Sequence, residues 1–137
     1  MKSSLQAGVA HVKRLTVDDS RLISFMGKDA RVYSTPSLIR DIEHACRDLI
    51  LQHADAGEDS VGMEIAMKHL APTLPGSNVE ISVRVTAVEG RRVSFEVAAR
   101  DDLEAISSGT HARFVVDIGK TVERLKAKAA KREALKK

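Results

Sequence analysis

Two periodicities of hydrophobic residues divide the chain. From Thr35 to about His53, apolar side chains recur every three to four residues, which is typical of one face of an α-helix. The residues that carry this pattern are Leu38, Ile39, Ile42, Ala45, Cys46, Leu49 and Ile50. After this segment the period changes to two, which is typical of half-buried strands. The change predicts one long helix followed by a series of strands.

The alternating segments define both the fold class and the expected assembly. With one further strand before the helix, strands are predicted at residues 9–17, 61–70, 78–88, 92–100 and 105–118. Residues 18–33 are expected to form a loop with a short helical turn. This order predicts an α+β domain in which an antiparallel sheet wraps around one long, mostly apolar helix. One helix cannot cover both faces of a sheet and all of its edges, so we expect a homodimer.

Composition narrows the class of protein. The 137 residues suffice for one domain, and because aromatic residues make up only 3% of them, the core is expected to be aliphatic. The single cysteine, Cys46, excludes an intrachain disulfide and is expected to be a small buried hydrophobic residue. Neither a signal-peptide core nor an apolar stretch of transmembrane length is present in the sequence. These features predict a soluble, cytoplasmic protein without a membrane partner.

Charge separates a body from a tail. Residues 119–137 contain eight Lys or Arg and two Glu, whereas residues 1–118 contain 14 basic and 17 acidic residues. We therefore expect one domain over 1–118 and a basic helical tail over 119–137. The first turns of the tail are expected to pack on the body, because apolar residues recur at helical spacing at Ile118, Val122, Leu125 and Ala129. Because no aromatic stacking platform accompanies the charge, nucleic acid is not an expected partner. The tail is either a solvated helix or a weak site for phosphate groups.

Glu43 interrupts the apolar face of the predicted helix. One interpretation places its carboxylate at the margin of the helix, where it reaches solvent or pairs with Arg40 or Arg47. The other is a partly buried carboxylate that serves as a base, a nucleophile or an orienting group. Periodicity alone leaves both interpretations open.

Two further polar residues are candidates for chemistry. His69 lies at the end of a predicted strand, directly before the segment LAPTLPG, where it is either structural or a proton-transfer group. Thr35 is expected to be the N-cap of the helix, and a helix N-terminus also attracts negative charge. Metal sites are not expected, because there is one cysteine and no His-x-x-x-His, and neither a phosphate loop nor a dinucleotide fingerprint is present.

Taken together, these residues resemble the hotdog-fold acyl-CoA thioesterases of the fluoroacetyl-CoA thioesterase group. Thr35, Glu43 and His69 stand at the spacing of that family's threonine, glutamate and histidine. The segments HLAPTLPG (69–76), VEGRRVS (88–94) and SGTH (108–111) match its loop, hairpin and last-strand motifs. The resemblance covers roughly residues 8–125.

The resemblance implies a hotdog fold, a homodimer and hydrolysis of an acyl thioester of coenzyme A or of a carrier protein. It implies that Glu43 attacks the carbonyl or activates water, His69 transfers protons, and Thr35 positions the carbonyl or the other two groups. Gly62 matches a glycine beside which the substrate approaches the backbone. The three side chains are then expected to converge on one pocket near the start of the helix. No metal or redox cofactor is implied.

The chain departs from the family pattern at two positions. Pro36 replaces a glycine and removes one amide donor from the helix start, although the amides of Ser37 and Leu38 are expected to remain free for an oxyanion. Asp29 stands where the family has a phenylalanine over the acyl pocket, so fluoroacetyl is not the expected acyl group. The alternative function is a hotdog module that binds acyl thioesters without turnover. A hydratase-type hotdog enzyme would require a different arrangement of His and acid.

Overall fold

The computed structural model describes residues 1–136, and the order of its elements confirms the predicted order. The chain forms β1 (Ala10–Thr16), the short 3-10 turns η1 (Asp19–Arg21) and η2 (Lys28–Ala30), α1 (Thr35–Leu51), β2 (Glu58–His69), β3 (Asn78–Glu89), β4 (Arg92–Arg100), β5 (Ala105–Asp117) and α2 (Ile118–Ala134). The main difference is that β2 starts three residues earlier than the alternation predicts.

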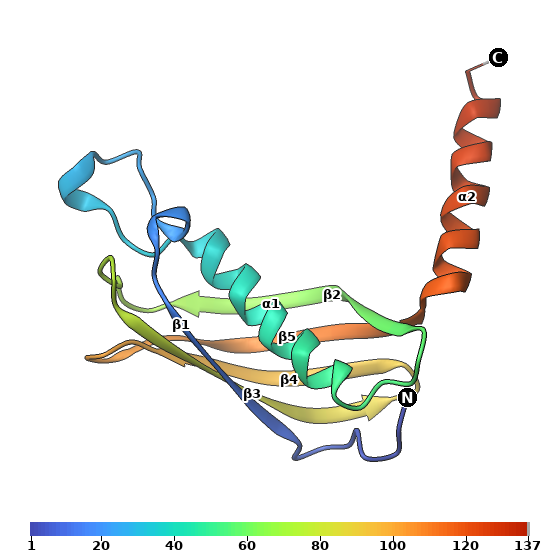
Figure 1. The fold of residues 1–137 in the computed structure, drawn as a ribbon, viewed down its shortest axis with the longest axis horizontal. Helices are drawn as coiled ribbons and strands as arrows, with labels where there is room; N and C mark the ends of the chain where they lie inside the picture. Colours follow the sequence, from blue (N-terminus) through green and yellow to red (C-terminus); the bar gives the residue numbers. More distant parts are fainter. Residues whose placement is uncertain (137) are drawn as a thin grey trace.

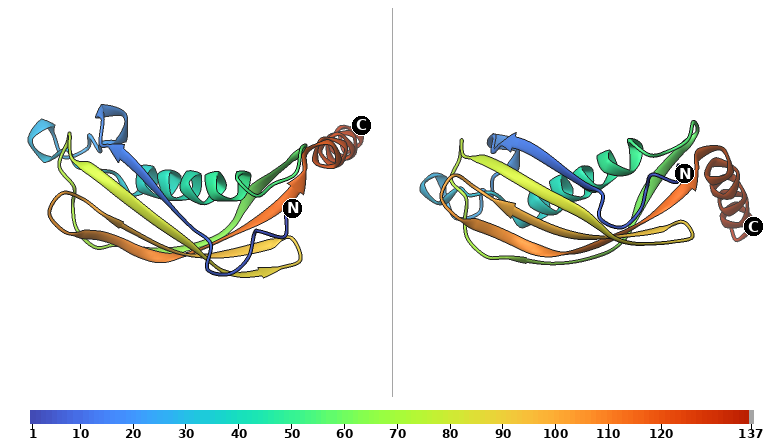
Figure 2. Two further views of the ribbon diagram at one scale, coloured as in Figure 1. Left: turned by 60° about the horizontal axis from the view of Figure 1, so that its bottom comes forward. Right: turned by 90° about the horizontal axis from the view of Figure 1, so that it is seen from below.

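All five strands form one antiparallel sheet in the order β1-β3-β4-β5-β2. The sheet is curved, and α1 lies along its concave face (Figures 1 and 2). The architecture is therefore α+β with one long helix wrapped by a sheet, as predicted. β1 and β2 form the two edges of the sheet, and α1 lies between them in the chain. The helix therefore carries the chain from the β1 edge to the β2 edge.

The core between α1 and the sheet is mainly aliphatic. It consists of one face of the helix and the inward residues of the strands, including Leu38, Ile42, Leu49, Val83, Val97 and Ile106, with Phe95 and Tyr33 as its buried aromatic residues. Cys46 is buried there, as expected, and burial raises the pKa of its thiol to about 12. A thiol in that state is a packing group rather than a nucleophile.

The start of α1 is fixed by Ser34 and not by Thr35. The Ser34 hydroxyl accepts a hydrogen bond from the amide of Ser37 at 3.1 Å, which is the usual geometry of an N-cap. Thr35 and Pro36 are the first residues of the helix proper. The prediction that Thr35 is the cap was therefore wrong by one residue. This shift leaves the Thr35 hydroxyl available for another partner.

A buried carboxylate ties the loop before α1 to the helix. Asp41, on the first turns of α1, accepts hydrogen bonds from the Tyr33 hydroxyl and from the guanidinium of Arg21. Burial and this contact raise the pKa of Tyr33 far above its ordinary value, so the phenol stays a donor. The network holds the loop over 18–33 against the end of α1 that carries Thr35.

β2 is an edge strand with an exposed outer side. Val61 and Met63 are each 50% exposed, and a register shift between Gly62 and Glu64 marks a β-bulge opposite β5. Exposed edge strands pair readily with other chains, and bulges often re-aim side chains next to functional sites. The outer side of β2 is thus open to pairing with another chain.

The C-terminal helix leaves the body of the molecule instead of packing on it. α2 begins at Ile118 and projects away from the sheet (Figure 1), and Val122 and Leu125 are 43% and 60% exposed. The expectation that the first turns of the tail pack on the body was therefore wrong for a single chain. Ile118 is also 47% exposed, so the body covers little of the apolar side of this helix. Neither helix in residues 1–136 has the length and hydropathy of a membrane-spanning segment.

Candidate active site

Thr35 and His69 meet at one end of the sheet. The Thr35 hydroxyl oxygen lies 2.7 Å from Nδ1 of His69, a hydrogen bond between the first residue of α1 and the last residue of β2. The contact forms because capping by Ser34 leaves the Thr35 side chain free. It brings together two predicted site residues that stand 34 positions apart in the chain.

The imidazole of His69 is partly withdrawn from solvent. Burial lowers its pKa below the ordinary value of 6.5, because desolvation disfavours the charged ring. Its Nε2 atom is buried and has no hydrogen-bond partner within residues 1–136. A neutral ring with one uncommitted nitrogen is able to accept or donate a proton near neutral pH.

An apolar cleft of about 360 Å³ opens beside this pair. Thr35 and His69 form part of its wall, and the remaining lining comes from the loop before α1 and the loop after β2, including Ile23, Phe25, Val32, Leu70, Ala71 and Pro72. An apolar cleft with a few converging polar groups is the usual form of a small-molecule site. The cleft therefore suits the hydrocarbon part of a ligand whose polar group lies against Thr35 and His69.

The amides expected to serve an oxyanion are already occupied. The Ser37 amide donates to the Ser34 hydroxyl, and the Leu38 amide donates to the Ser34 carbonyl at 3.0 Å. The expectation that both remain free was wrong. Within residues 1–136 the amide of Thr35 has no acceptor, and it is the first amide of the helix. Helix N-termini favour negative charge, so this amide is the donor best placed to stabilise an oxyanion.

Glu43 lies two turns further along α1, beside β2. A Cβ atom added to Gly62 would lie 3.3 Å from Oε1 of Glu43 and 3.4 Å from Cε1 of His111. The Glu43 side chain is 39% exposed, and Arg47 is hydrogen-bonded to Asp59 instead. The interpretation of Glu43 as the partner of Arg47 is therefore wrong. Gly62 leaves the space that the carboxylate faces.

Arg113 is the cation nearest to Glu43, and sequence reasoning missed it. Its Nη1 lies 4.0 Å from Oε2 of Glu43, and its side chain is only 5% exposed. The guanidinium also donates to the hydroxyl and the carbonyl of Ser60, both at 2.8 Å. The alternation along β5 could have found it, because Arg113 shares the inward face with His111 and Val115. Arg113 is therefore a buried cation that faces the Glu43 side chain without a direct hydrogen bond to its oxygens.

One chain therefore holds two groups of site residues and not a single pocket. Thr35 contacts His69, and Glu43 faces Gly62 and Arg113. Eight residues of α-helix separate Thr35 from Glu43, which corresponds to about 12 Å along the axis. The predicted convergence of all three side chains is thus found for Thr35 and His69, while Glu43 stands apart from them within the chain.

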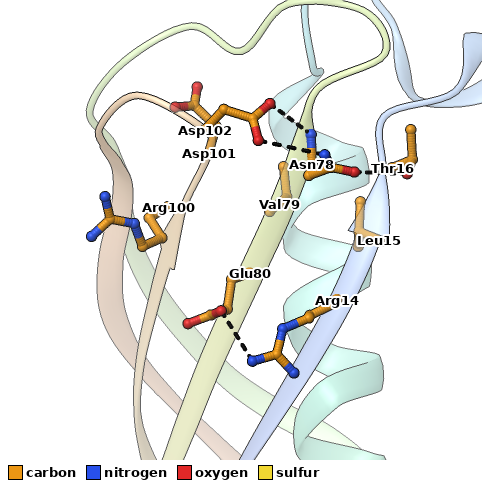
Figure 3. A pocket seen from close by; sticks show the side chains of 9 residues that line it. All are labelled: Arg14, Leu15, Thr16, Asn78, Val79, Glu80, Arg100, Asp101 and Asp102. Carbon is orange, nitrogen blue, oxygen red and sulfur yellow. Dashed lines mark hydrogen bonds and ion pairs between the residues drawn. The ribbon is translucent and has the colours of Figure 1, made fainter.

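A second cleft, of about 370 Å³, lies elsewhere on the sheet (Figure 3). Two of its charged side chains pair with each other, since Arg14 lies 3.3 Å from Glu80, and Asp102 accepts hydrogen bonds from Asn78. None of the predicted site residues lines it. In residues 1–136, no three His, Cys, Asp or Glu side chains lie together in an arrangement that could hold a metal ion.

Comparison with known proteins decides the family. The family model for the fluoroacetyl-CoA-specific thioesterase matches residues 17–119. This range includes every predicted site residue and all residues that line the apolar cleft. The chain belongs to this thioesterase family. The resemblance inferred from the motifs is thereby confirmed.

Individual members of the family are similar in sequence and in structure. The fluoroacetyl-CoA thioesterase of Streptantibioticus cattleyicolor is 37% identical over 89 residues, which span 65% of this chain and 64% of that protein. A crystal structure of a mutant of the fluoroacetyl-CoA-specific thioesterase FlK superposes with a TM-score of 0.85 at 28% identity, over 93% of this chain and 99% of that one.

A Thermus thermophilus protein of the thioesterase superfamily shows the same fold. It superposes with a TM-score of 0.84 at 27% identity, over 93% of this chain and 96% of the other. A mutant of FlK has also been crystallised with fluoroacetate and CoA. The hotdog thioesterase architecture is thus shared over nearly the full length of the chain, including part of α2.

Proposed function

We propose that this thioesterase-family chain hydrolyses an acyl thioester of coenzyme A, releasing a carboxylic acid and the free thiol. The observation that carries the proposal is the hydrogen bond between Thr35 and His69 at the mouth of an apolar cleft. The cleft offers room for an acyl group, and the pair offers a hydroxyl and a neutral imidazole to its thioester carbonyl. The relative crystallised with CoA supports coenzyme A as the thiol.

Each group has a role that its surroundings support. The carbonyl oxygen would lie near the Thr35 amide, where negative charge that develops on it is stabilised by the helix N-terminus. The Glu43 carboxylate, facing the cation of Arg113, either attacks the carbonyl carbon or takes a proton from an attacking water. His69 would pass to the departing thiolate the proton that the attacking water gives up, so that the neutral ring is regenerated. One water is consumed for each thioester cleaved.

We further propose that the site is completed in a homodimer. Glu43 is about 12 Å along the helix from Thr35, too far for both to reach one carbonyl in the same chain. The exposed β2 edge carries Gly62 near its start and His69 at its end. Antiparallel pairing of this edge with a second copy would bring the Gly62 and Glu43 of one chain towards the Thr35 and His69 of the other. The unpartnered Nε2 of His69 would then face the shared site.

Turnover is tested with a panel of acyl-CoA thioesters that includes acetyl-CoA and fluoroacetyl-CoA, and thiol release is followed with a chromogenic thiol reagent. Glu43→Gln and His69→Ala should each lower the rate about 100-fold or more, in line with the loss of an acid–base group. Arg40→Gln, an exposed change on the same helix, is the matched control. Binding of acyl-CoA without turnover in the wild type would instead favour the non-catalytic module.

Complementation tests whether the site spans two chains. Differently tagged Glu43→Gln and His69→Ala chains are co-expressed, and the mixed dimers are isolated. If the site is shared, each mixed dimer has one intact site, so about half of the wild-type activity per dimer should return. Activity that stays at the level of the separate variants would show that each chain carries its own complete site.

A further inference from the structure

His111, the last residue of the SGTH motif, lies beside Arg113. The proposed reaction gives His111 no role. His111 and Arg113 are alternate residues of β5, so both side chains point towards α1. Both are almost completely buried. The imidazole also stacks on Phe95, with ring centroids 6.3 Å apart. A rigid, buried polar pair next to a catalytic carboxylate calls for a functional explanation.

The neighbours of His111 fix one tautomer. Nδ1 lies 2.8 Å from the carbonyl oxygen of Glu64, which only accepts, so Nδ1 carries the proton. Nε2 lies 3.2 Å from Nη1 of Arg113, which only donates, so Nε2 is the acceptor. Burial and the charge of Arg113 both lower the pKa of His111, although the contact with Glu64 acts in the other direction. The ring is therefore neutral and holds Nη1 of Arg113.

This hold leaves the guanidinium at a defined distance from Glu43. Ser60 fixes Nε and Nη2 of Arg113, His111 fixes Nη1, and Oε2 of Glu43 stays 4.0 Å away. At that distance the cation faces the Glu43 side chain without a direct hydrogen bond to its oxygens. A direct, bidentate ion pair would occupy the lone pairs that attack on a carbonyl or a water requires.

The other charged groups around Glu43 are committed elsewhere. On β2, Asp59 is hydrogen-bonded to Arg47 of the next helical turn, and on β1, Lys13 pairs with Asp48 at 2.8 Å. Arg40 and His44, on either side of Glu43 along α1, are exposed. Arg113 is thus the buried cation that faces the carboxylate, and its orientation controls how the two interact.

We propose that His111 is a positioning residue that restrains Arg113, so that the carboxyl oxygens of Glu43 stay free to react. This inference rests on the proposed function of Glu43. When the restraint is removed, Nη1 is free to close on Glu43 and to occupy its oxygens. His111 itself touches neither the thioester nor the attacking water in this scheme.

A double-mutant cycle tests the inference. His111→Leu should lower kcat about 10- to 100-fold with KM within about threefold, because the reacting group is displaced while substrate binding is kept. His111→Gln, which replaces the Nε2 acceptor with an amide oxygen, should restore most of the rate. Adding His111→Leu to Arg113→Met should cost little beyond Arg113→Met alone, because His111 acts through Arg113. His11→Leu, at the opposite edge of the sheet, is the matched control.

Three outcomes would overturn the inference: equal losses in His111→Leu and His111→Gln, full activity in His111→Leu, or multiplicative effects in the double variant. NMR of the arginine side chains gives a readout without turnover. Wild-type Arg113 should show separate, slowly exchanging Nη signals that merge in His111→Leu. A wild type without thioesterase activity would refute the proposed function. The Arg113 signals would then still test whether His111 restrains Arg113. Unchanged signals in His111→Leu would refute it.

Discussion

Gly62 and Glu43 face each other across the gap between β2 and α1, and the glycine has no side chain to fill that gap. A Cβ at this position would lie 3.3 Å from Oε1 of the carboxylate, which is closer than ordinary van der Waals contact. The backbone of Gly62 is not in a left-handed conformation, so backbone strain does not explain the glycine. The space that it leaves for the carboxylate does.

Gly62→Ala should therefore impair turnover more than folding. The added methyl group pushes the carboxylate by a few tenths of an ångström, and small misplacements of a reacting group cost about 10-fold or more in rate. The melting temperature should change by only a few degrees, because the exposed carboxylate is able to move. Thiol release and thermal unfolding measure the two effects. A variant with wild-type kcat would mean that Gly62 has no part in placing Glu43.

Gly109→Ala should give the opposite result. A Cβ there would lie 2.2 Å from the backbone carbonyl oxygen of Ala66 and 2.7 Å from Cα of Met67, and neither atom is at the end of a flexible side chain. Overpacking of this kind costs about 1–3 kcal/mol or more. The expected result is a clear fall in the free energy of unfolding, measured by urea titration. Stability equal to that of the wild type would mean that β2 and β5 are less closely packed than the structure indicates.

Thr35→Ser should retain most of the rate, whereas Thr35→Ala should lower kcat by about 10-fold. Serine keeps the hydroxyl that contacts Nδ1 of His69 at 2.7 Å, and alanine removes the exposed hydrogen bond that orients the imidazole. Because Ser34 is the cap, Thr35→Ala should leave the stability of α1 nearly unchanged, while Ser34→Ala should lower it by about 1 kcal/mol. Steady-state kinetics and thermal unfolding separate the two residues. A larger loss of stability in Thr35→Ala would reassign the cap.

Stability should decline as the pH falls below about 6.5. Burial lowers the pKa of both His69 and His111, so between their lowered values and 6.5 the unfolded chain binds more protons than the folded one. The free energy of unfolding therefore rises with pH across this window. On acidification, the stability contributed by the two neutral histidines is lost. Urea titrations from pH 7.5 to 5 measure the slope. His69→Gln should flatten it, and the exposed His44→Gln should not.

The periodicity of the sequence was sufficient for the fold. The 3.6-residue pattern from Leu38 to Ile50 and the alternation from Asn78 to Arg100 were both strong, because each element buries one face against the same core. β2 was less well defined in the sequence. It lies at the edge of the sheet with both sides partly exposed, so no clean alternation marks its start at Glu58.

The residue types of the site were also determined by the sequence, since Thr35, Glu43 and His69 stood out by spacing and motif. Their contacts were decided only by the tertiary structure. The helix begins one residue earlier than the sequence indicated, so Ser34 caps α1. The hydroxyl of Thr35 is then free to contact His69. Arg113 came to face Glu43 through pairing of β5 with β2, which joins residues some 50 positions apart in the chain. A linear pattern records which face a side chain occupies, but the groups it meets there depend on strand register and on how helix and sheet pack.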